Sequence, residues 1–149
     1  MYTLSETSLK MLKGVHPNLV NFMTELIKIS PWNFKITAGV RSAEEQNRLY
    51  QKGRTAPGAK VTNVDGYKLK SNHQVKYDGL GYAADIGVIV NGEYKGTWKD
   101  FHFYQDLYNT AKKAGLLEKY GIEWGGNCWK TFKDAPHWQI KGADRVPYK

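Results

Sequence analysis

The chain has 149 residues, a formal net charge of +8, and a composition of 41% hydrophobic and 13% aromatic residues. These values exclude a disordered chain, and we expect residues 1–149 to form a single domain. No apolar run is long enough to cross a bilayer, and the N-terminus lacks the basic start and apolar stretch of a secretory signal. We therefore expect neither stable membrane insertion nor a signal peptide.

The positive charge indicates an anionic partner. The Lys and Arg residues are scattered rather than clustered, and no basic helix or RNA-binding motif is present, so we do not expect nucleic acid to be that partner. The single cysteine, Cys128, cannot form an intramolecular disulfide. It follows a Trp-Gly-Gly-Asn turn, which favours a packing role over metal binding.

Two helices and a strand are predicted in the first forty residues. Residues 4–12 have mixed helical character, and a clearer helix begins at Pro17, because apolar residues between 19 and 27 recur at helical spacing. His16 precedes this helix and is expected to be structural or at the surface. The alternating, β-branched segment 34–38 then predicts a strand.

A capping box follows that strand. Ser42, with Glu45 three residues later, predicts a helix over 43–52. Arg41 is thereby placed at a strand-to-helix junction, from which its side chain can face a cleft. Residues 53–70 are rich in Gly, Pro, Asn and Asp, and they predict a long loop with at most a short hairpin.

The C-terminal half combines short strands with one long helix. Strands are predicted over 82–90, 93–95, 122–124 and 137–140, with Asn91-Gly92 as the turn between the first two. A helix is predicted over 98–115, with His102 exposed. Its inner face comprises Phe101, Tyr104, Leu107, Tyr108, Ala111 and Ala114. Together these elements predict an α+β fold: a small antiparallel sheet with helices packed on it.

Four residues in two stretches indicate chemistry. His73 and Asp85 lie in one stretch, and Asp134 and His137 lie in the other. Two imidazoles and one carboxylate are usual protein donors of a hydrolytic zinc site, and a further carboxylate can act as general base. Asp85 begins the apolar run DIGVIV, where a carboxylate is costly unless it is paired or metal-bound. Each residue alone is more often a packed histidine or a capping aspartate in a turn than a functional group, so the prediction rests on the combination.

The strand that contains His137 adds a directional argument. If Trp138 points into the core, His137 and Gln139 share the opposite face and look into a cleft. Asp134 precedes His137 across a Pro-containing turn, which places its carboxylate near the metal without forcing it to coordinate.

The residues around these four resemble the M15 zinc peptidases. SNH at 71–73 followed by GYAAD at 81–85 is similar to their S-x-H-x-x-G-x-A-x-D signature, and DAPH at 134–137 is similar to their closing carboxylate-x-x-H motif. The segment 39–50 resembles their G-x-R-S/T-x-x-E-Q-x-x-L-Y motif. GRTAPGAKVTN and WGGN resemble the L-alanyl-D-glutamate endopeptidase branch, which includes phage endolysins. The resemblance covers residues 15–140.

This resemblance implies a Hedgehog/DD-peptidase-like fold that forms one zinc metallopeptidase domain. His73, Asp85 and His137 would bind Zn²⁺, Asp134 would be the catalytic base, and Arg41 would stabilise the oxyanion or clamp a substrate carboxylate. The implied substrate is the peptidoglycan stem peptide, cleaved at the L-Ala-D-Glu bond. The implied setting is a monomeric phage endolysin, made in the host bacterial cytoplasm and released to the cell wall through a holin.

One departure and three alternatives remain open. Lys76 to Leu80 reads as a five-residue insertion between His73 and Asp85, and its Asp78 is a rival ligand, although the kept Gly-x-Ala-x-Asp pattern favours Asp85. The alternatives are a D-Ala-D-Ala carboxypeptidase or dipeptidase of bacterial wall turnover, a non-enzymatic zinc-binding module of the same fold, and a basic nucleic-acid-binding domain.

Overall fold

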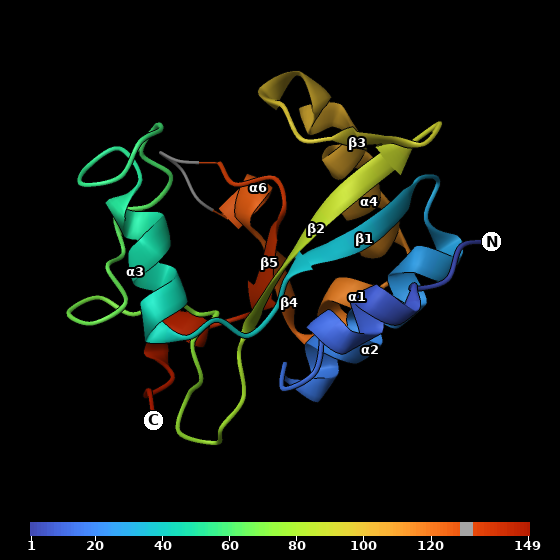
Figure 1. Cartoon of the computed structure of the whole chain (residues 1–149). Coiled ribbons are helices and arrows are strands. Elements are labelled where there is room, and N and C mark those ends of the chain that lie inside the picture. Colours follow the sequence, from blue (N-terminus) through green and yellow to red (C-terminus); the bar gives the residue numbers. More distant parts are fainter. Residues whose placement is uncertain (129–132) are drawn as a thin grey trace.

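The computed structural model describes residues 1–128 and 133–149, without the side chain of Cys128, so the packing role predicted for that cysteine lies outside the described residues (Figure 1). The described helices are α1 (Glu6–Met11), α2 (Pro17–Ile29), α3 (Ala43–Gln51), α4 (Phe101–Lys113), α5 (Leu116–Tyr120) and α6 (Gly125–Cys128). The strands are β1 (Asn33–Ala38), β2 (Ala83–Val90), β3 (Glu93–Lys95), β4 (Ile122–Trp124) and β5 (His137–Ile140). None of the described helices has both the length and the apolar character needed to cross a membrane.

Side-chain caps and a proline mark three of the helix starts. Ser5 Oγ accepts a hydrogen bond from Ser8 N at 3.1 Å at the start of α1, and α2 begins at its predicted proline. At α3, Ser42 Oγ accepts from Glu45 N and the Glu45 carboxylate accepts from Ser42 N, each at 3.1 Å. These bonds satisfy backbone N–H groups that have no partner inside the helix. The capping box therefore starts α3 directly after Arg41.

The five strands form one antiparallel sheet in the order β1-β2-β5-β4, with β3 also paired to β2. Strand β2 is central, because it pairs with β5 over Ala83–Asp85, with β3 over Val88–Val90, and with β1 along its other edge. A β-bulge interrupts the register of β1 between Ile36 and Ala38. Bulges bend a strand locally. The bend lies next to Asp85, which pairs with Ala38.

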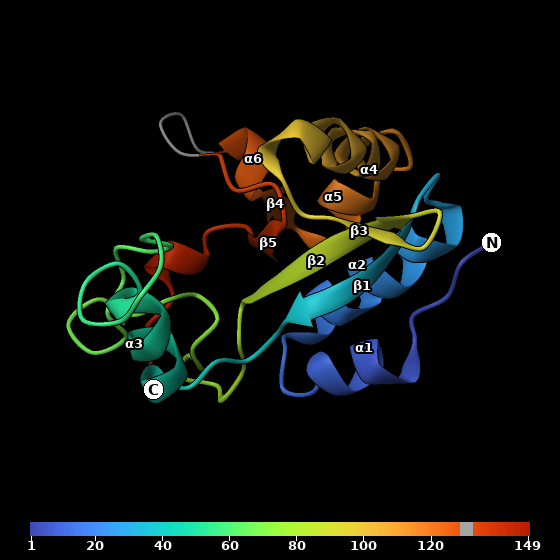
Figure 2. The same cartoon turned by 45° about the horizontal axis from the view of Figure 1, so that its top comes forward.

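The two faces of this sheet have different roles. Ala84, Ile86 and Trp138 are fully buried in the hydrophobic core, which they form with α2, α4 and α5 (Figure 2). Because side chains alternate along a strand, the burial of Trp138 places His137 and Gln139 on the opposite face, as predicted. One face of the sheet therefore holds the fold together, and the other carries polar side chains.

The outer edge of β1 is covered by α1. Ile36 N, on that edge strand, donates a hydrogen bond to the buried Ser8 Oγ at 3.0 Å. Unpaired edge N–H groups invite association with other strands, and a side-chain acceptor removes that risk. At the other end of the molecule, α3 and its loops extend beyond the sheet, and the C-terminus lies beside them (Figure 1).

Most predicted elements form, with three differences. Ala114 is exposed rather than on the inner face, because α4 ends at Lys113. The Trp-Gly-Gly-Asn segment is not a turn, since residues 125–128 form α6. Helix α5 has only five residues between two left-handed glycines, too few to show a periodic pattern. Residues 53–70 form the predicted loop and contain no strand, and His102 is exposed as predicted.

Candidate metal centre

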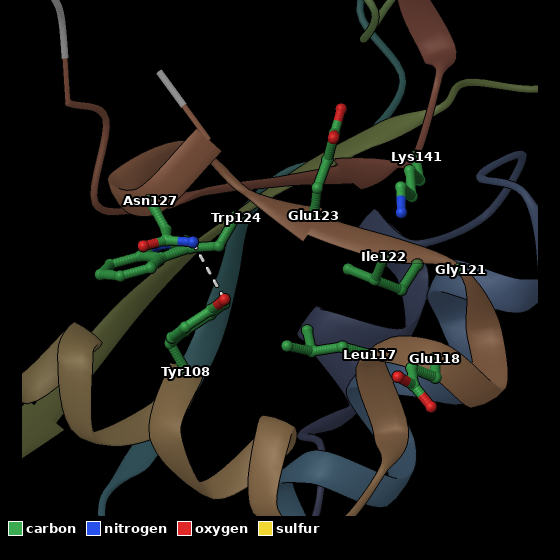
Figure 3. Close-up of a pocket in the computed structure, with 9 residues that line it drawn as sticks. All are labelled: Tyr108, Leu117, Glu118, Gly121, Ile122, Glu123, Trp124, Asn127 and Lys141. Atoms are coloured by element: carbon green, nitrogen blue, oxygen red, sulfur yellow. Dashed lines mark hydrogen bonds between the residues drawn. The ribbon is translucent and has the colours of Figure 1, made fainter. Parts of the chain in front are cut away.

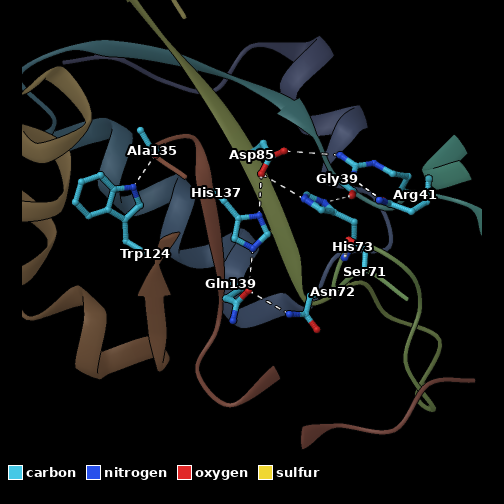
Figure 4. A network of polar contacts seen from close by, with 11 residues as sticks. Gly39, Arg41, Ser71, Asn72, His73, Asp85, Trp124, Ala135, His137 and Gln139 are labelled. Carbon is cyan, nitrogen blue, oxygen red and sulfur yellow. Dashed lines mark hydrogen bonds and ion pairs between the residues drawn. The ribbon is translucent and has the colours of Figure 1, made fainter. Parts of the chain in front are cut away.

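Three side chains meet on the polar face of the sheet. Asp85 Oδ1 lies 3.3 Å from His73 Nε2 and 3.1 Å from His137 Nδ1. One ligand atom from each residue lies within 4.8 Å of those of the other two. Both histidines are buried, and Figure 4 shows Asp85 in contact with both imidazole rings. The three residues predicted as a ligand set are therefore assembled in space, although they come from a loop, from β2 and from β5.

The sheet and the preceding loop each contribute to this assembly. Asp85 and His137 are direct partners in the β2-β5 pair, so their side chains project from the same face. His73 lies in the loop before β2, and its carbonyl oxygen accepts a hydrogen bond from Arg41 N at 2.9 Å. That bond ties the loop to the junction between β1 and α3, which brings Arg41 to the same site.

The outer nitrogen of each imidazole is held by an oxygen acceptor. His73 Nδ1 lies 2.8 Å from the carbonyl oxygen of Gly39, which can only accept, so this nitrogen carries the proton. His137 Nε2 lies 2.8 Å from Gln139 Oε1. Gln139 Nε2 donates to the Glu123 carboxylate at 2.7 Å, which fixes the orientation of the amide and makes its oxygen the acceptor from His137. This arrangement is typical of metal-binding histidines.

The inner nitrogens therefore need a cation. In the neutral imidazoles they carry lone pairs, and both face Asp85 Oδ1, which is also an acceptor. Three acceptors at this distance repel one another unless a proton or a metal ion lies among them. Two imidazole nitrogens and one carboxylate oxygen match the donors of a catalytic zinc site. The residues present thus fit a metal ion by their chemistry as well as by their spacing.

The ionisation of this group reflects the same need. Burial opposes ionisation of Asp85, but the charge of His73 and hydrogen bonds from both histidines outweigh it and hold the pKa of Asp85 well below its usual value. Burial likewise opposes protonation of His137, yet the hydrogen bond and charge of Asp85 raise its pKa. The site thus keeps an ionised carboxylate and draws positive charge toward it.

Arg41 lies against the other oxygen of Asp85. Its Nη2 is 3.7 Å from Asp85 Oδ2, and its Nη1 donates to Gln46 Oε1 at 2.8 Å. Gln46 is almost fully buried on α3 and donates in turn to the Val64 carbonyl oxygen at 2.9 Å. The guanidinium is therefore held by two partners at the edge of the site, where part of it stays accessible.

Asp134 is half-buried in the turn before β5. Its backbone N–H donates to the Gly125 carbonyl oxygen at 3.1 Å, and its carbonyl oxygen accepts from His137 N at 3.2 Å. Gly125 allows this close approach, because a Cβ there would lie 2.6 Å from the Asp134 carbonyl oxygen. Burial, and then the charge of Asp85, raise the pKa of the Asp134 carboxyl above its usual value. A carboxylate with raised pKa near a candidate metal site has the properties of a general base.

Asp78 lies elsewhere. Its carboxylate accepts hydrogen bonds from the Tyr82 hydroxyl at 2.6 Å and from Leu80 N at 3.1 Å, within the turn formed by residues 76–80. Among the described residues it does not belong to the His73, Asp85 and His137 group. The geometry therefore favours Asp85 over Asp78 as the ligand.

Three contributing residues were not predicted as site residues, although two of them, Gly39 and Gln46, belong to the motif at 39–50. Gly39 acts through a carbonyl oxygen that any residue possesses, and Gln46 and Glu123 act through contacts made only in the folded chain. Glu123 also lines a cavity of about 420 Å³ beside β4, together with Tyr108, Leu117, Trp124 and Lys141 among others (Figure 3). None of the three candidate ligands lines that cavity. It is thus separate from the candidate metal centre.

The comparisons with known proteins agree with this geometry. A family model described as phage L-alanyl-D-glutamate peptidase matches residues 1–140. The chain is 35% identical over 105 residues to the peptidoglycan L-alanyl-D-glutamate endopeptidase CwlK of Bacillus subtilis (strain 168). That alignment covers 70% of this chain and 59% of CwlK, so the chain spans less than two thirds of this relative.

A solved structure is similar over nearly the whole chain. It is the crystal structure of the Serratia marcescens L-Ala D-Glu endopeptidase ChiX, with a TM-score of 0.69 and 26% sequence identity. The match covers 97% of this chain and 93% of ChiX. The mixed fold of helices on a small antiparallel sheet, predicted from the sequence, is therefore confirmed by both the structure and this likeness.

Proposed function

The chain belongs to the phage L-alanyl-D-glutamate peptidase family, and on that premise we propose that it is a zinc endopeptidase that hydrolyses the L-Ala-D-Glu bond of peptidoglycan stem peptides, as an endolysin does. The observation that carries the proposal is the arrangement of His73, Asp85 and His137, with both inner imidazole nitrogens facing one carboxylate oxygen. CwlK and ChiX are both described as endopeptidases for this bond, which supports the choice of substrate.

In this proposal His73 Nε2, His137 Nδ1 and the Asp85 carboxylate hold the metal. A bound zinc ion supplies a Lewis acid and lowers the pKa of a coordinated water toward ~7. The protein contributes the orientation of the ligands, because the Gly39 carbonyl oxygen and Gln139 Oε1 hold the outer nitrogen of each ring.

Asp134 would move the protons. Its raised pKa makes it a stronger base than an ordinary aspartate, so it can accept a proton from the attacking water at neutral pH. The protonated carboxyl can then deliver that proton to the leaving amine of D-Glu as the amide bond breaks. The half-buried position of Asp134 fits this role, since it keeps the carboxylate close to the site without full exposure to water.

Arg41 would bind negative charge on the substrate. Stem peptides carry free carboxylates and develop an oxyanion during hydrolysis, and a guanidinium can bind either one through two hydrogen bonds. We expect Arg41→Lys to lower kcat/KM roughly 100-fold, because lysine cannot span both Gln46 and a substrate oxygen. The control is Arg48→Lys, which changes an exposed arginine on α3, the helix that follows Arg41. Equal kcat/KM for both variants, measured on purified muropeptides, would remove Arg41 from the mechanism.

The test of the proposed function is a digest of purified peptidoglycan, analysed by mass spectrometry with and without a chelator. The expected products are glycan-linked L-Ala and free peptides that begin with D-Glu, formed only when zinc is present. Release of D-Ala would instead identify a carboxypeptidase or dipeptidase. Zinc binding without any cleavage product would identify a non-enzymatic module. DNA binding without any cleavage product would favour the nucleic-acid alternative.

A further inference from the structure

The inserted segment and the C-terminal end of the chain pair with each other. Lys76 and Tyr148 form an antiparallel bridge. Tyr77 N donates to the Pro147 carbonyl oxygen at 2.8 Å, and Lys149 N donates to the Val75 carbonyl oxygen at 3.4 Å. We call residues 75–77 and 147–149 together the clasp. The first part overlaps the segment interpreted as an insertion, and the second lies beyond the residues that the family model matches.

At the centre of the clasp lies a buried lysine. Lys76 has 0% exposure, and its Nζ lies 3.6 Å from the centre of the Tyr148 ring. Nζ also donates to Asn72 Oδ1 at 2.8 Å. Lysines are almost never fully buried unless their charge is satisfied, because desolvation of an ammonium group is costly. The Tyr148 ring and the Asn72 oxygen together satisfy this ammonium group.

Lys76 fixes the orientation of the amide it touches. An ammonium group can only donate, so Asn72 must present Oδ1 to Lys76 and Nδ2 to the opposite side. Asn72 Nδ2 donates to Gln139 Oε1 at 3.2 Å and to Asp144 Oδ1 at 2.7 Å. Lys76 and the Asp144 carboxylate, which can only accept, thus together set which end of the Asn72 amide faces the metal site.

Gln139 connects Asn72 to the candidate metal ligand His137. Gln139 is almost fully buried, and its Oε1 accepts both from Asn72 and from His137 Nε2, at 2.8 Å from the latter. Asp85 Oδ1 and Gln139 Oε1 can both only accept, so when a metal ion lies at Nδ1 the proton of His137 is on Nε2, where Gln139 Oε1 holds it. Figure 4 shows this path from Asn72 through Gln139 to His137.

We propose that the clasp holds the His137 ring in its metal-binding orientation, and that Lys76 is a positioning residue that acts through Asn72 and Gln139, together with the carboxylates of Asp144 and Glu123. This inference rests on the proposed zinc site but goes beyond it, because it assigns a role to the insertion and to the C-terminal segment. None of the three candidate ligands belongs to the clasp. Its effect is to keep the Asn72 and Gln139 amides ordered beside the imidazole ring of His137.

The first test is Lys76→Met, which keeps the length of the side chain and removes its charge. We expect its zinc affinity, measured by competition with a chromophoric chelator, to fall about tenfold, as is usual for residues that orient a metal ligand. ¹H–¹⁵N NMR of the zinc-loaded protein should show a His137 Nε2–H that exchanges slowly with water in the wild type and faster in the variant. The control is Lys68→Met, an exposed lysine of the neighbouring loop, with wild-type values in both measurements.

Tyr148→Ala tests the clasp without leaving a buried charge unpaired, because water then reaches Lys76. Its expected loss of zinc affinity is smaller, about threefold, against no loss for the exposed Tyr67→Ala. A rescue is also expected: Gln139→Glu with Glu123→Gln, added to Lys76→Met, restores affinity, because a carboxylate accepts from His137 in either orientation.

The outcomes separate the two proposals. If the wild-type protein neither binds zinc nor cleaves the stem peptide, the proposed function fails. If the wild type does both, and folded Lys76→Met and Tyr148→Ala proteins bind zinc as tightly as it does with an unchanged exchange rate of the His137 Nε2–H, the clasp proposal is wrong and the pairing is only structural.

Discussion

Replacing Asp134 by Asn is expected to lower kcat by about 10²- to 10⁴-fold while zinc binding stays at the wild-type level. The amide keeps the size of the side chain but cannot accept the proton of the attacking water. Because Asp134 is outside the His73, Asp85 and His137 group, its loss should leave the metal ligands in place. The measurement is kcat on muropeptides, with metal content determined on the same protein samples.

The matched control is Asp78→Asn. Asp78 is the rival carboxylate of the insertion. An asparagine Oδ1 can still accept from Leu80 N, and its Nδ2 can donate to the Tyr82 hydroxyl oxygen in place of the bond that Oδ2 accepts. We expect this variant to keep full activity. An active Asp134→Asn protein with bound zinc would contradict the mechanism, and an inactive Asp78→Asn protein would reopen the question of which carboxylate serves the site.

Asp134→Asn should also stabilise the metal-free protein at neutral pH. Burial raises the folded-state pKa of Asp134 above its usual value of 3.8, so ionisation of this group favours the unfolded chain. This penalty is absent below the unfolded-state pKa and fully present above the raised folded-state pKa. Asp134→Asn removes it, so the gain in Tm should be largest at neutral pH and should shrink as the pH falls toward 3.8.

The second large effect is expected from loss of the ligand set. Asp85→Asn should abolish tight zinc binding and reduce activity at least as much as Asp134→Asn, because the carboxylate is the only anionic member of the described group. The metal-free protein should also lose roughly 3–5 kcal/mol of stability, since Arg41 and the two histidines then face each other without their shared anion. Zinc titration and thermal unfolding check both parts.

The wild-type protein offers a reversible version of this experiment. Removal of metal by a chelator should stop cleavage and lower Tm, and added zinc should restore both, because a ligand that binds only the folded state stabilises it. The control is His102→Gln, which changes an exposed histidine outside the group of candidate ligands and should respond to chelator and zinc as the wild type does.

The outcome that would contradict the ligand assignment comes from the Asp85→Asn variant. If that variant binds zinc with wild-type affinity, another carboxylate serves as the ligand.

Much of the fold follows from local rules that act over a few residues. The capping box at Ser42 and Glu45 starts α3, and the alternation of β5 places Trp138 in the core and His137 on the other face. These signals depend only on near neighbours in the chain. By contrast, α5 and α6 are too short to show a periodic pattern of apolar residues. Ala114 is exposed because α4 ends at Lys113, the residue before it.

The candidate site likewise has some features that the local sequence predicts and others that depend on tertiary contacts. The sequence by itself determined the types of donor to expect, since two imidazoles and a carboxylate in motifs that resemble those of a zinc peptidase predict a metal site. Only the tertiary structure decided that Asp85 and not Asp78 faces the histidines, because that choice depends on the β2-β5 register and on how the insertion turns away. Tautomers, amide orientations and the clasp also depend on contacts between residues far apart in the chain, such as Lys76 with Tyr148 and Asn72 with Gln139. Such contacts exist only once the core has brought those segments together, so no local pattern can encode them.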